Sequence, residues 1–432
     1  MRVVAAIYTI IGMLYLCGNA ILVRPLSVNG GVDGVVLRVT TLDAAGPGSL
    51  RSALEDGRPR LVVFDVGGVI DLRGQSLIVT NPHLTIAGQT APDPGITIIR
   101  GGLTIATYDA VVEHMAVRLG DAGGPDDSLG ARRAHDVLFD HCSATWAVDE
   151  NLSVSGPADV DPSRDPEATS HDVTLRSCLI AEGLMHANHP KGAHSMGTLI
   201  HDGVRNVVIE GCLYAHNNER NPRLKGGSTA RIIGNVMYNW GSACVGVGRR
   251  GNRRMLQPAE ATLIGNVAIP GADTRDRALV KNVDPGARVS LRGNVLVEAA
   301  TPHPAPSLHS GATLSPLRGA RGLSARSFSP LAGRRCPEGA DEGSAACATI
   351  ARVLRSAGSR PAHRDPIDAR IVRSVIDRTG RIIDSQDQVG GYPIRPRTQR
   401  ALVVPDGAEE RRRWLNALSD ALNVAPSPDW QK

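Results

Sequence analysis

The chain has 432 residues, with 48 Lys and Arg against 43 Asp and Glu, so its formal net charge is only +5. A charge excess this small over this length argues against a nucleic-acid partner unless the cations cluster locally. Apolar residues make up 42% of the chain, which is enough for a substantial core and excludes disorder throughout.

The N-terminus, MRVVAAIYTIIGMLYLCGNA, predicts a signal peptide over residues 1–20. One Arg precedes an apolar run from Val3 to Leu16, and small residues lead to an expected cut after Ala20. We therefore expect a secreted protein, extracellular or periplasmic, without membrane association after cleavage. The apolar run is short for a span of about 20 residues. A retained anchor and lipid attachment at Cys17 remain as alternatives.

Before the repeats, GPGSLRSALEDG predicts a short helix from about Ser49 to Leu54, followed by a strand. We expect this segment to cap the N-terminal end of a coil, because repeat folds must hide their terminal backbone groups.

A short pattern then recurs and determines the expected fold. Its copies are LTIAGQ, VVEHM, VLFDHC, VTLRSC, VVIEGC, RIIGN, TLIGN and VSLRGN, between residues 84 and 294. Each copy is a β-branched strand followed by a bend, so it buries its inward face only against a stacked neighbour. We expect an all-β chain with a parallel β-helix over residues 21–300. An all-β sandwich competes, but the repeat period is long for hairpins.

The bend residues predict stacks of like side chains inside the coil. Asn235, Asn266 and Asn294 are expected to form a hydrogen-bonded ladder. The preceding bends carry cysteines, expected as small buried thiols, with disulfides between coils as the alternative: Cys142, Cys178 and Cys212. In an exported protein Cys336 and Cys347 could close a short loop.

After residue 300 the chain becomes rich in Pro, Gly, Ser and Arg. Residues 364–395 are expected to be ordered again, and 408–422 predict an amphipathic helix. We therefore expect residues 301–432 to form a loop-rich extension with a short helix, packed on the coil.

A group of cations stands in HNNERNPRLKGG, residues 216–227. Pro222 stiffens the backbone that presents Arg220, Arg223 and Lys225. Guanidinium groups bind carboxylates through two parallel hydrogen bonds, so this spacing predicts recognition of an acidic polymer.

Acidic residues flank the VLFDHC strand in two loops, namely Asp126, Asp127, Asp149 and Glu150. Stacked coils would bring these loops together, and clustered carboxylates attract a hard cation such as Ca²⁺. A solvated acidic surface is an equally open interpretation.

The chain resembles the polysaccharide lyase family 1 pectate lyases, specifically their bacterial branch, from about residue 38 to 395. The motifs that carry the resemblance are GQTAPDPGI, FDHCSATWAVDENLSV, KGAH, RNPR, RDPIDARIV and VGGYP. This resemblance implies a right-handed parallel β-helix that binds Ca²⁺ and cleaves polygalacturonate by β-elimination.

Matched by position, Arg220 is implied to be the catalytic base, and Lys191, Arg223 and Lys225 to bind substrate. Asp127 and Asp149 match calcium ligands. Ser153 stands where the family has a further aspartate, which either weakens the expected calcium site or shifts its third ligand to Glu150 or Asp126. We expect a monomer.

Several interpretations remain open beside this one. A polygalacturonase-type hydrolase would use the same carboxylates as acid and base, and a non-catalytic β-helix would only bind polysaccharide. Arg118 is expected either to line the substrate groove or to be a surface charge. His186, His189, His194 and His201 have no helical metal-binding spacing, so they are not expected to bind a metal.

Overall fold

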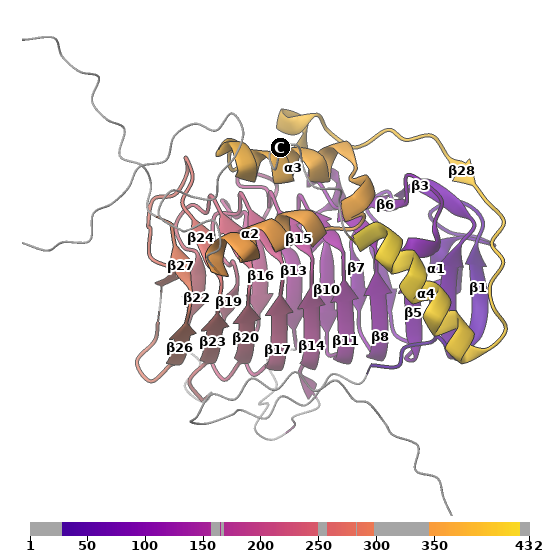
Figure 1. Ribbon diagram of the computed structural model, residues 1–432, viewed down its shortest axis with the longest axis horizontal. Coiled ribbons are helices and arrows are strands. Elements are labelled where there is room, and N and C mark those ends of the chain that lie inside the picture. Colours follow the sequence, from indigo (N-terminus) through magenta and orange to yellow (C-terminus); the bar gives the residue numbers. More distant parts are fainter. Residues whose placement is uncertain are drawn as a thin grey trace, which may run out of the picture.

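The computed structural model describes residues 28–156, 165, 168–248, 257–281, 283–297 and 345–423. Most described strands lie side by side along one coil, as Figure 1 shows. They form three sheets, in which every pairing is parallel except that of β28 with β3. Each coil contributes one strand to each sheet in turn, so the predicted parallel β-helix is confirmed. The expected signal peptide lies outside the described residues.

The three sheets are called here sheet 1, sheet 2 and sheet 3. Sheet 1 contains β1 (Val35–Val39), β2 (Arg60–Phe64), β5 (Leu84–Ala87), β8 (Tyr108–Glu113), β11 (His135–Asp140), β14 (His171–Arg176), β17 (Arg205–Glu210), β20 (Thr229–Ile233), β23 (Glu260–Ile264) and β26 (Arg288–Arg292). Sheet 2 contains β4 (Leu77–Val79), β7 (Leu103–Ile105), β10 (Leu129–Arg132), β13 (Glu150–Ser155), β16 (Met196–Ile200), β19 (Arg223–Leu224), β22 (Val245–Val247) and β25 (Val280–Lys281).

Sheet 3 contains β3 (Val66–Asp71), β6 (Ile96–Ile99), β9 (Met115–Arg118), β12 (Ser143–Thr145), β15 (Leu179–Ala181), β18 (Leu213–Ala215), β21 (Val236–Tyr238), β24 (Val267–Ile269), β27 (Val295–Leu296) and β28 (Thr398–Gln399). Short 3₁₀ turns lie at η1 (Gly88–Thr90), η2 (Asp121–Gly123), η4 (Pro361–His363) and η5 (Gln386–Val389).

The interior of the coil contains the predicted stacks. Asn235 Nδ2 donates to Asn266 Oδ1 at 2.9 Å, and Asn266 Nδ2 donates to Asn294 Oδ1 at 2.8 Å. The three bend cysteines are buried free thiols, as predicted, so the alternative of disulfides between coils is wrong. Cys347 is disulfide-bonded, but its expected partner Cys336 lies outside the described residues.

The N-terminal cap has the predicted form. Helix α1 (Leu50–Glu55) begins after Ser49, whose hydroxyl accepts from the Ser52 amide. Such a cap satisfies one of the backbone donors that a helix leaves free at its start. Leu50 and Leu54 of α1 pack into the core that fills the coil.

The C-terminal segment is more helical than its composition suggested. It contains α2 (Ala345–Ser356), α3 (Pro366–Asp377) and α4 (Ala408–Asn423), where one helix was expected. Figure 1 shows these helices lying along one side of the coil. Val353 of α2 and Ile371 of α3 belong to one buried cluster with Leu213 and Val236 of sheet 3. The segment therefore packs on the coil, as expected.

Arg118 neither lines a groove nor lies on the surface. Its guanidinium is fully buried and donates to Asp365 Oδ2 at 2.5 Å and to Asp368 Oδ1 at 2.8 Å. Asp365 also caps α3. The RDPIDARIV motif therefore supplies the carboxylates that attach the C-terminal segment to β9, because a buried arginine is stable only when paired.

Two buried histidines also join the coil to this segment. His114 Nδ1 lies 2.8 Å from the Ser359 carbonyl oxygen, and His216 Nε2 lies 2.8 Å from Ser374 Oγ. Burial lowers the pKa of both His114 and His216 to about 4. Both rings are therefore neutral in the folded protein at neutral pH.

We expect acid to destabilise the protein through these two rings. An unfolded imidazole has a pKa of about 6.5, so between pH 6.5 and 4 the unfolded chain binds more protons. Each neutral ring makes its full contribution to the free energy of unfolding above about pH 6.5. As pH drops to 4, the free energy of unfolding falls by roughly 3 kcal/mol for each ring. Urea unfolding of His216→Gln at pH 7 and pH 4.5 should show a smaller pH dependence than the unsubstituted protein. An unchanged pH dependence would contradict this.

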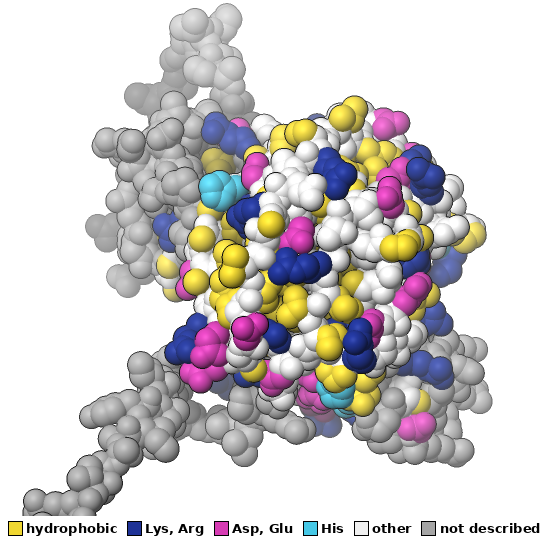
Figure 2. Space-filling model, turned by 90° about the vertical axis from the view of Figure 1, so that its right-hand side faces the viewer, with side chains coloured by type: hydrophobic (Ala, Val, Ile, Leu, Met, Phe, Trp, Pro, Cys, Tyr) yellow, Lys and Arg dark blue, Asp and Glu magenta, His cyan; other side chains and the backbone are white. Residues whose placement is uncertain are grey.

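Figure 2 shows the end of the coil near β1. Positively and negatively charged side chains are interspersed over this face. The described side chains on that face form no patch of one sign. Among the described residues, no helix combines the length and apolar character that a membrane span requires.

Candidate active site

Four of the predicted site residues meet along one edge of sheet 2, where its strands begin. Asp127 lies just before β10, Asp149 and Glu150 at the start of β13, and Arg220 shortly before β19. In the sheet β10 is the direct neighbour of β13, and β19 lies two strands from β13 on its other side, in the order β19, β16, β13 and β10. Stacking of the coils thus brings residues that are distant in sequence to one place.

The acidic residues form a compact cluster. One carboxylate oxygen each from Asp127, Asp149 and Glu150 lie within 4.8 Å of one another. Asp127 accepts from the Glu150 amide at 2.9 Å and from the Ser153 hydroxyl. Burial, together with the carboxylates of Asp149 and Asp126, raises the pKa of Asp127 to about 8. The crowded carboxylates therefore repel one another, and Asp127 is largely protonated at neutral pH in the absence of a bound cation.

Arg220 faces this cluster and forms an ion pair with Glu150. The Arg220 side chain is 19% exposed, whereas that of Glu150 is 4% exposed. The Arg220 backbone has φ of 64°, a left-handed conformation that costs a non-glycine residue about 1 kcal/mol or more. A Cβ on Gly197 of the neighbouring β16 would lie 2.5 Å from the Arg220 carbonyl oxygen, so the close approach requires glycine there.

The other predicted cations differ in exposure. Lys191 is exposed in the loop before β16, and Lys225 is half-buried just after β19. Burial lowers the pKa of Lys225, and the nearby charges of Arg220, Arg223 and Lys191 lower it further, against the influence of Asp202. Arg223 is only 4% exposed and donates to the Gly248 carbonyl at 3.1 Å. The four cations therefore share one positive region, with Arg223 beneath its surface.

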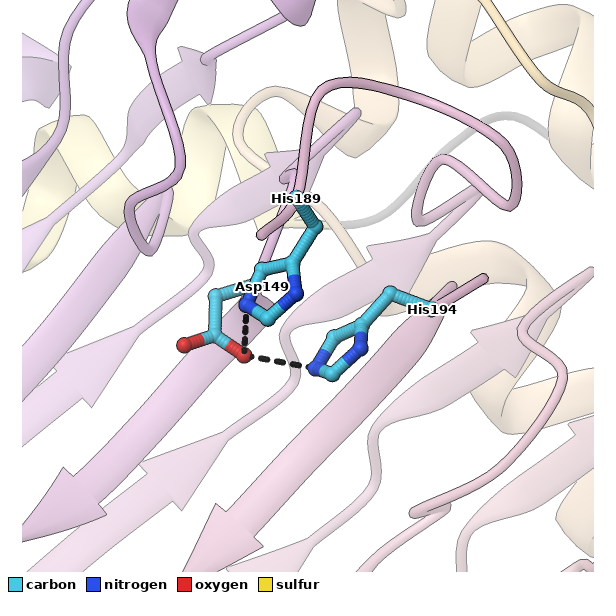
Figure 3. Close-up of side chains that lie close together, drawn as sticks. All are labelled: Asp149, His189 and His194. Carbon is cyan, nitrogen blue, oxygen red and sulfur yellow. Dashed lines mark hydrogen bonds and ion pairs between the residues drawn. The ribbon is translucent and has the colours of Figure 1, made fainter. Parts of the chain in front are cut away.

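Two histidines hold Asp149, a feature that sequence spacing did not predict. His194 Nε2 lies 2.8 Å and His189 Nε2 lies 3.6 Å from Asp149 Oδ1, with the two rings stacked at 3.8 Å (Figure 3). Burial would raise the pKa of Asp149, but the hydrogen bond from His194 and nearby positive charge hold it below its usual value. The sequence feature that could have predicted this contact is the HPKGAH loop. Its two histidines are brought together by a turn of the loop and not by a helix.

Asp149, His189 and His194 could by distance also hold a metal ion. His189 Nδ1, however, accepts from the Lys191 amide at 3.1 Å, which leaves the proton of a neutral ring on Nε2. A metal-binding histidine usually donates from its second nitrogen instead. The cluster of Asp127, Asp149 and Glu150 offers only carboxylate oxygens, which suit a hard cation such as Ca²⁺.

The chain is similar to curated proteins named probable pectate lyase C. It is 32% identical over 321 residues to the one from Aspergillus terreus, covering 70% of each chain. It is 36% identical over 255 residues to one from Aspergillus fumigatus, covering 58% of this chain and 54% of that protein. These relatives are fungal, so they do not support the expected bacterial branch. No protein-family model matches the chain.

Among solved structures, the chain resembles a pectate lyase from Bacillus sp. N165 in complex with trigalacturonate. The TM-score is 0.46 at 11% identity, over 76% of this chain and 94% of that one. This likeness is too weak to bear on the chemistry.

Proposed function

Because this chain belongs to the pectate lyase family, we propose that it cleaves polygalacturonate by β-elimination, with Arg220 as the base. The observation that carries this proposal is that Arg220 lies directly beside the cluster of Asp127, Asp149 and Glu150. It supports a site in which one uronic acid could meet a cation and a guanidinium together.

In the proposed reaction Arg220 removes the proton at C5 of a galacturonate unit. The electron pair of the C5–H bond forms the C4–C5 double bond. The glycosidic C4–O bond breaks with its electrons on the leaving oxygen, which takes up a proton from water. An arginine has a pKa above about 12 and is a poor base unless nearby charge disfavours its protonated form. Lys225 supplies such positive charge near Arg220, and Arg223 and Lys191 lie near Lys225 in turn. Glu150 acts in the opposite direction, because its carboxylate stabilises the protonated guanidinium.

Removing a proton beside a carboxylate builds a second negative charge, so that carboxylate must first be neutralised. We propose that Lys191 and Lys225 bind substrate carboxylates directly. Arg223 donates to the Gly248 carbonyl and contributes its positive charge from beneath the protein surface. It binds substrate only where the polysaccharide reaches this buried side chain.

Asp127, Asp149 and Glu150 are proposed to hold Ca²⁺, with His194 and His189 fixing Asp149. When bound, the cation supplies neutralisation of the substrate carboxylate next to C5. We further propose, from the pattern of residues 1–20, that the protein is secreted. We also propose that it acts as a monomer on an acidic polysaccharide.

The test is the product formed from polygalacturonate. Elimination leaves an unsaturated uronide that absorbs ultraviolet light, whereas hydrolysis leaves a new reducing end without that absorbance. We expect absorbance to rise with time in the presence of calcium. New reducing ends without absorbance would favour the hydrolase, and neither product would favour a binding protein.

A further inference from the structure

A second asparagine ladder lies directly under the site. It consists of Asn151, Asn217 and Asn221, and is called here the Asn217 ladder. Asn151 Nδ2 donates to Asn217 Oδ1 at 2.9 Å, and Asn217 Nδ2 donates to Asn221 Oδ1 at 3.0 Å. All three side chains are at most 2% exposed.

Asn217 also ties down the coil that lies between the other two residues. Its Oδ1 accepts from the Gly183 amide at 3.0 Å, and its Nδ2 donates to the Ile180 carbonyl at 3.0 Å. Its amide group thus makes four hydrogen bonds, two accepted and two donated. A buried amide satisfied in this way has one orientation, because any rotation would leave polar atoms unpaired.

The ends of the Asn217 ladder adjoin the reacting side chains. Asn151 follows Glu150 in the chain, and Asn221 follows Arg220. Glu150 and Arg220 are far apart in sequence but form an ion pair, and Arg220 holds a left-handed backbone. The ladder is therefore a continuous set of hydrogen bonds between the two backbone positions that carry this pair.

We infer that Asn217 is a positioning residue, which sets the location of Arg220 relative to Glu150 and the acidic cluster through Asn151 and Asn221. The inference rests on the proposed function, since it gives Asn217 a role in the reaction. This role differs from that of the other ladder, called here the Asn266 ladder (Asn235, Asn266 and Asn294). The Asn266 ladder supports the coil at the corner between sheets 1 and 3, away from the site.

Asn266 provides a matched control. It is also fully buried, and its amide group also accepts two hydrogen bonds, from the Asn235 backbone and side chain, and donates two, to Ile232 and Asn294. Asn217→Ala and Asn266→Ala should therefore lower the melting temperature to a similar degree. Only Asn217→Ala should alter catalysis.

We expect Asn217→Ala to lower kcat per folded molecule by about 10- to 100-fold, since a displacement near 1 Å has effects of that size. KM should change little, and Asn266→Ala should keep the kcat of the unsubstituted protein. Equal kcat losses in both variants, or none in Asn217→Ala, would overturn the inference. If Asn217→Ala does not fold, Asn221→Ala decides, because it removes only the last ladder bond.

Amide hydrogen exchange gives a readout independent of activity. Exchange at residues 150–153 and 219–223 should accelerate in Asn217→Ala and not in Asn266→Ala. If exchange responds in this way but the unsubstituted protein forms no unsaturated product, the proposed function fails and the positional coupling stands. If the product forms but exchange at both segments is unchanged, the positional coupling fails.

Discussion

Arg220→Ala is expected to lower kcat on polygalacturonate by about 10³-fold, the range of a lost general base, with KM changed much less. Arg220 faces the acidic cluster and forms an ion pair with its Glu150. The rate of formation of the ultraviolet-absorbing product measures the loss. A kcat close to that of the unsubstituted protein would exclude Arg220 as the base.

Stability has to be measured beside activity for this variant. Removing Arg220 breaks the pair with Glu150, whose side chain is 4% exposed, and should cost roughly 3 kcal/mol of unfolding free energy without calcium. Arg220→Lys keeps a positive partner for Glu150 and should restore much of that stability without restoring kcat. Arg231→Ala, at a half-buried arginine of β20 in sheet 1, is the control and should leave kcat unchanged.

Removing calcium with a chelator should abolish product formation, and adding calcium back should restore it. Asp149→Asn should weaken calcium binding by about 100-fold, because a metal site tunes its affinity through the number of charged ligands. Calorimetric titration and the calcium dependence of kcat measure this. Full activity in the chelator would contradict the proposed metal role.

Asp136→Asn is a matched control for the change at Asp149. Asp136 also carries a histidine contact, His135 Nδ1 at 2.8 Å, but lies in sheet 1. Ser153→Asp is the opposite change: it adds a carboxylate beside Asp127, which now accepts from the Ser153 hydroxyl. We expect it to tighten calcium binding about tenfold and to destabilise the metal-free protein through repulsion.

The coil and its interior were predictable because they depend on local pattern. Alternation of apolar side chains determines which face of each strand turns inward, and the bend residue then stacks on its equivalent one coil away. Asn266 and Cys178 were therefore expected inside the coil, and both are fully buried. The helix at Leu50 followed in the same way from a serine cap.

Contacts between distant loops were not predictable in this way. Arg118 ends a strand, a position where an arginine is commonly a surface residue. Its partners are nevertheless Asp365 and Asp368 in the C-terminal segment. His189 and His194 lack helical spacing, but a loop folds back and stacks their rings on Asp149. No local period encodes such pairs, because each depends on how a loop of irregular length returns to the coil.

Residue order alone specified a stacked coil with buried thiols and amides, since each strand needs only a like neighbour to bury its inner face. It also identified Arg220, Asp127 and Asp149 as chemically suited residues, through their motifs. Their convergence required the folded chain: the left-handed backbone at Arg220, the close approach at Gly197 and the ladder through Asn217 arise from packing between coils. The arrangement of charge at this edge of sheet 2 is therefore a property of the assembled β-helix.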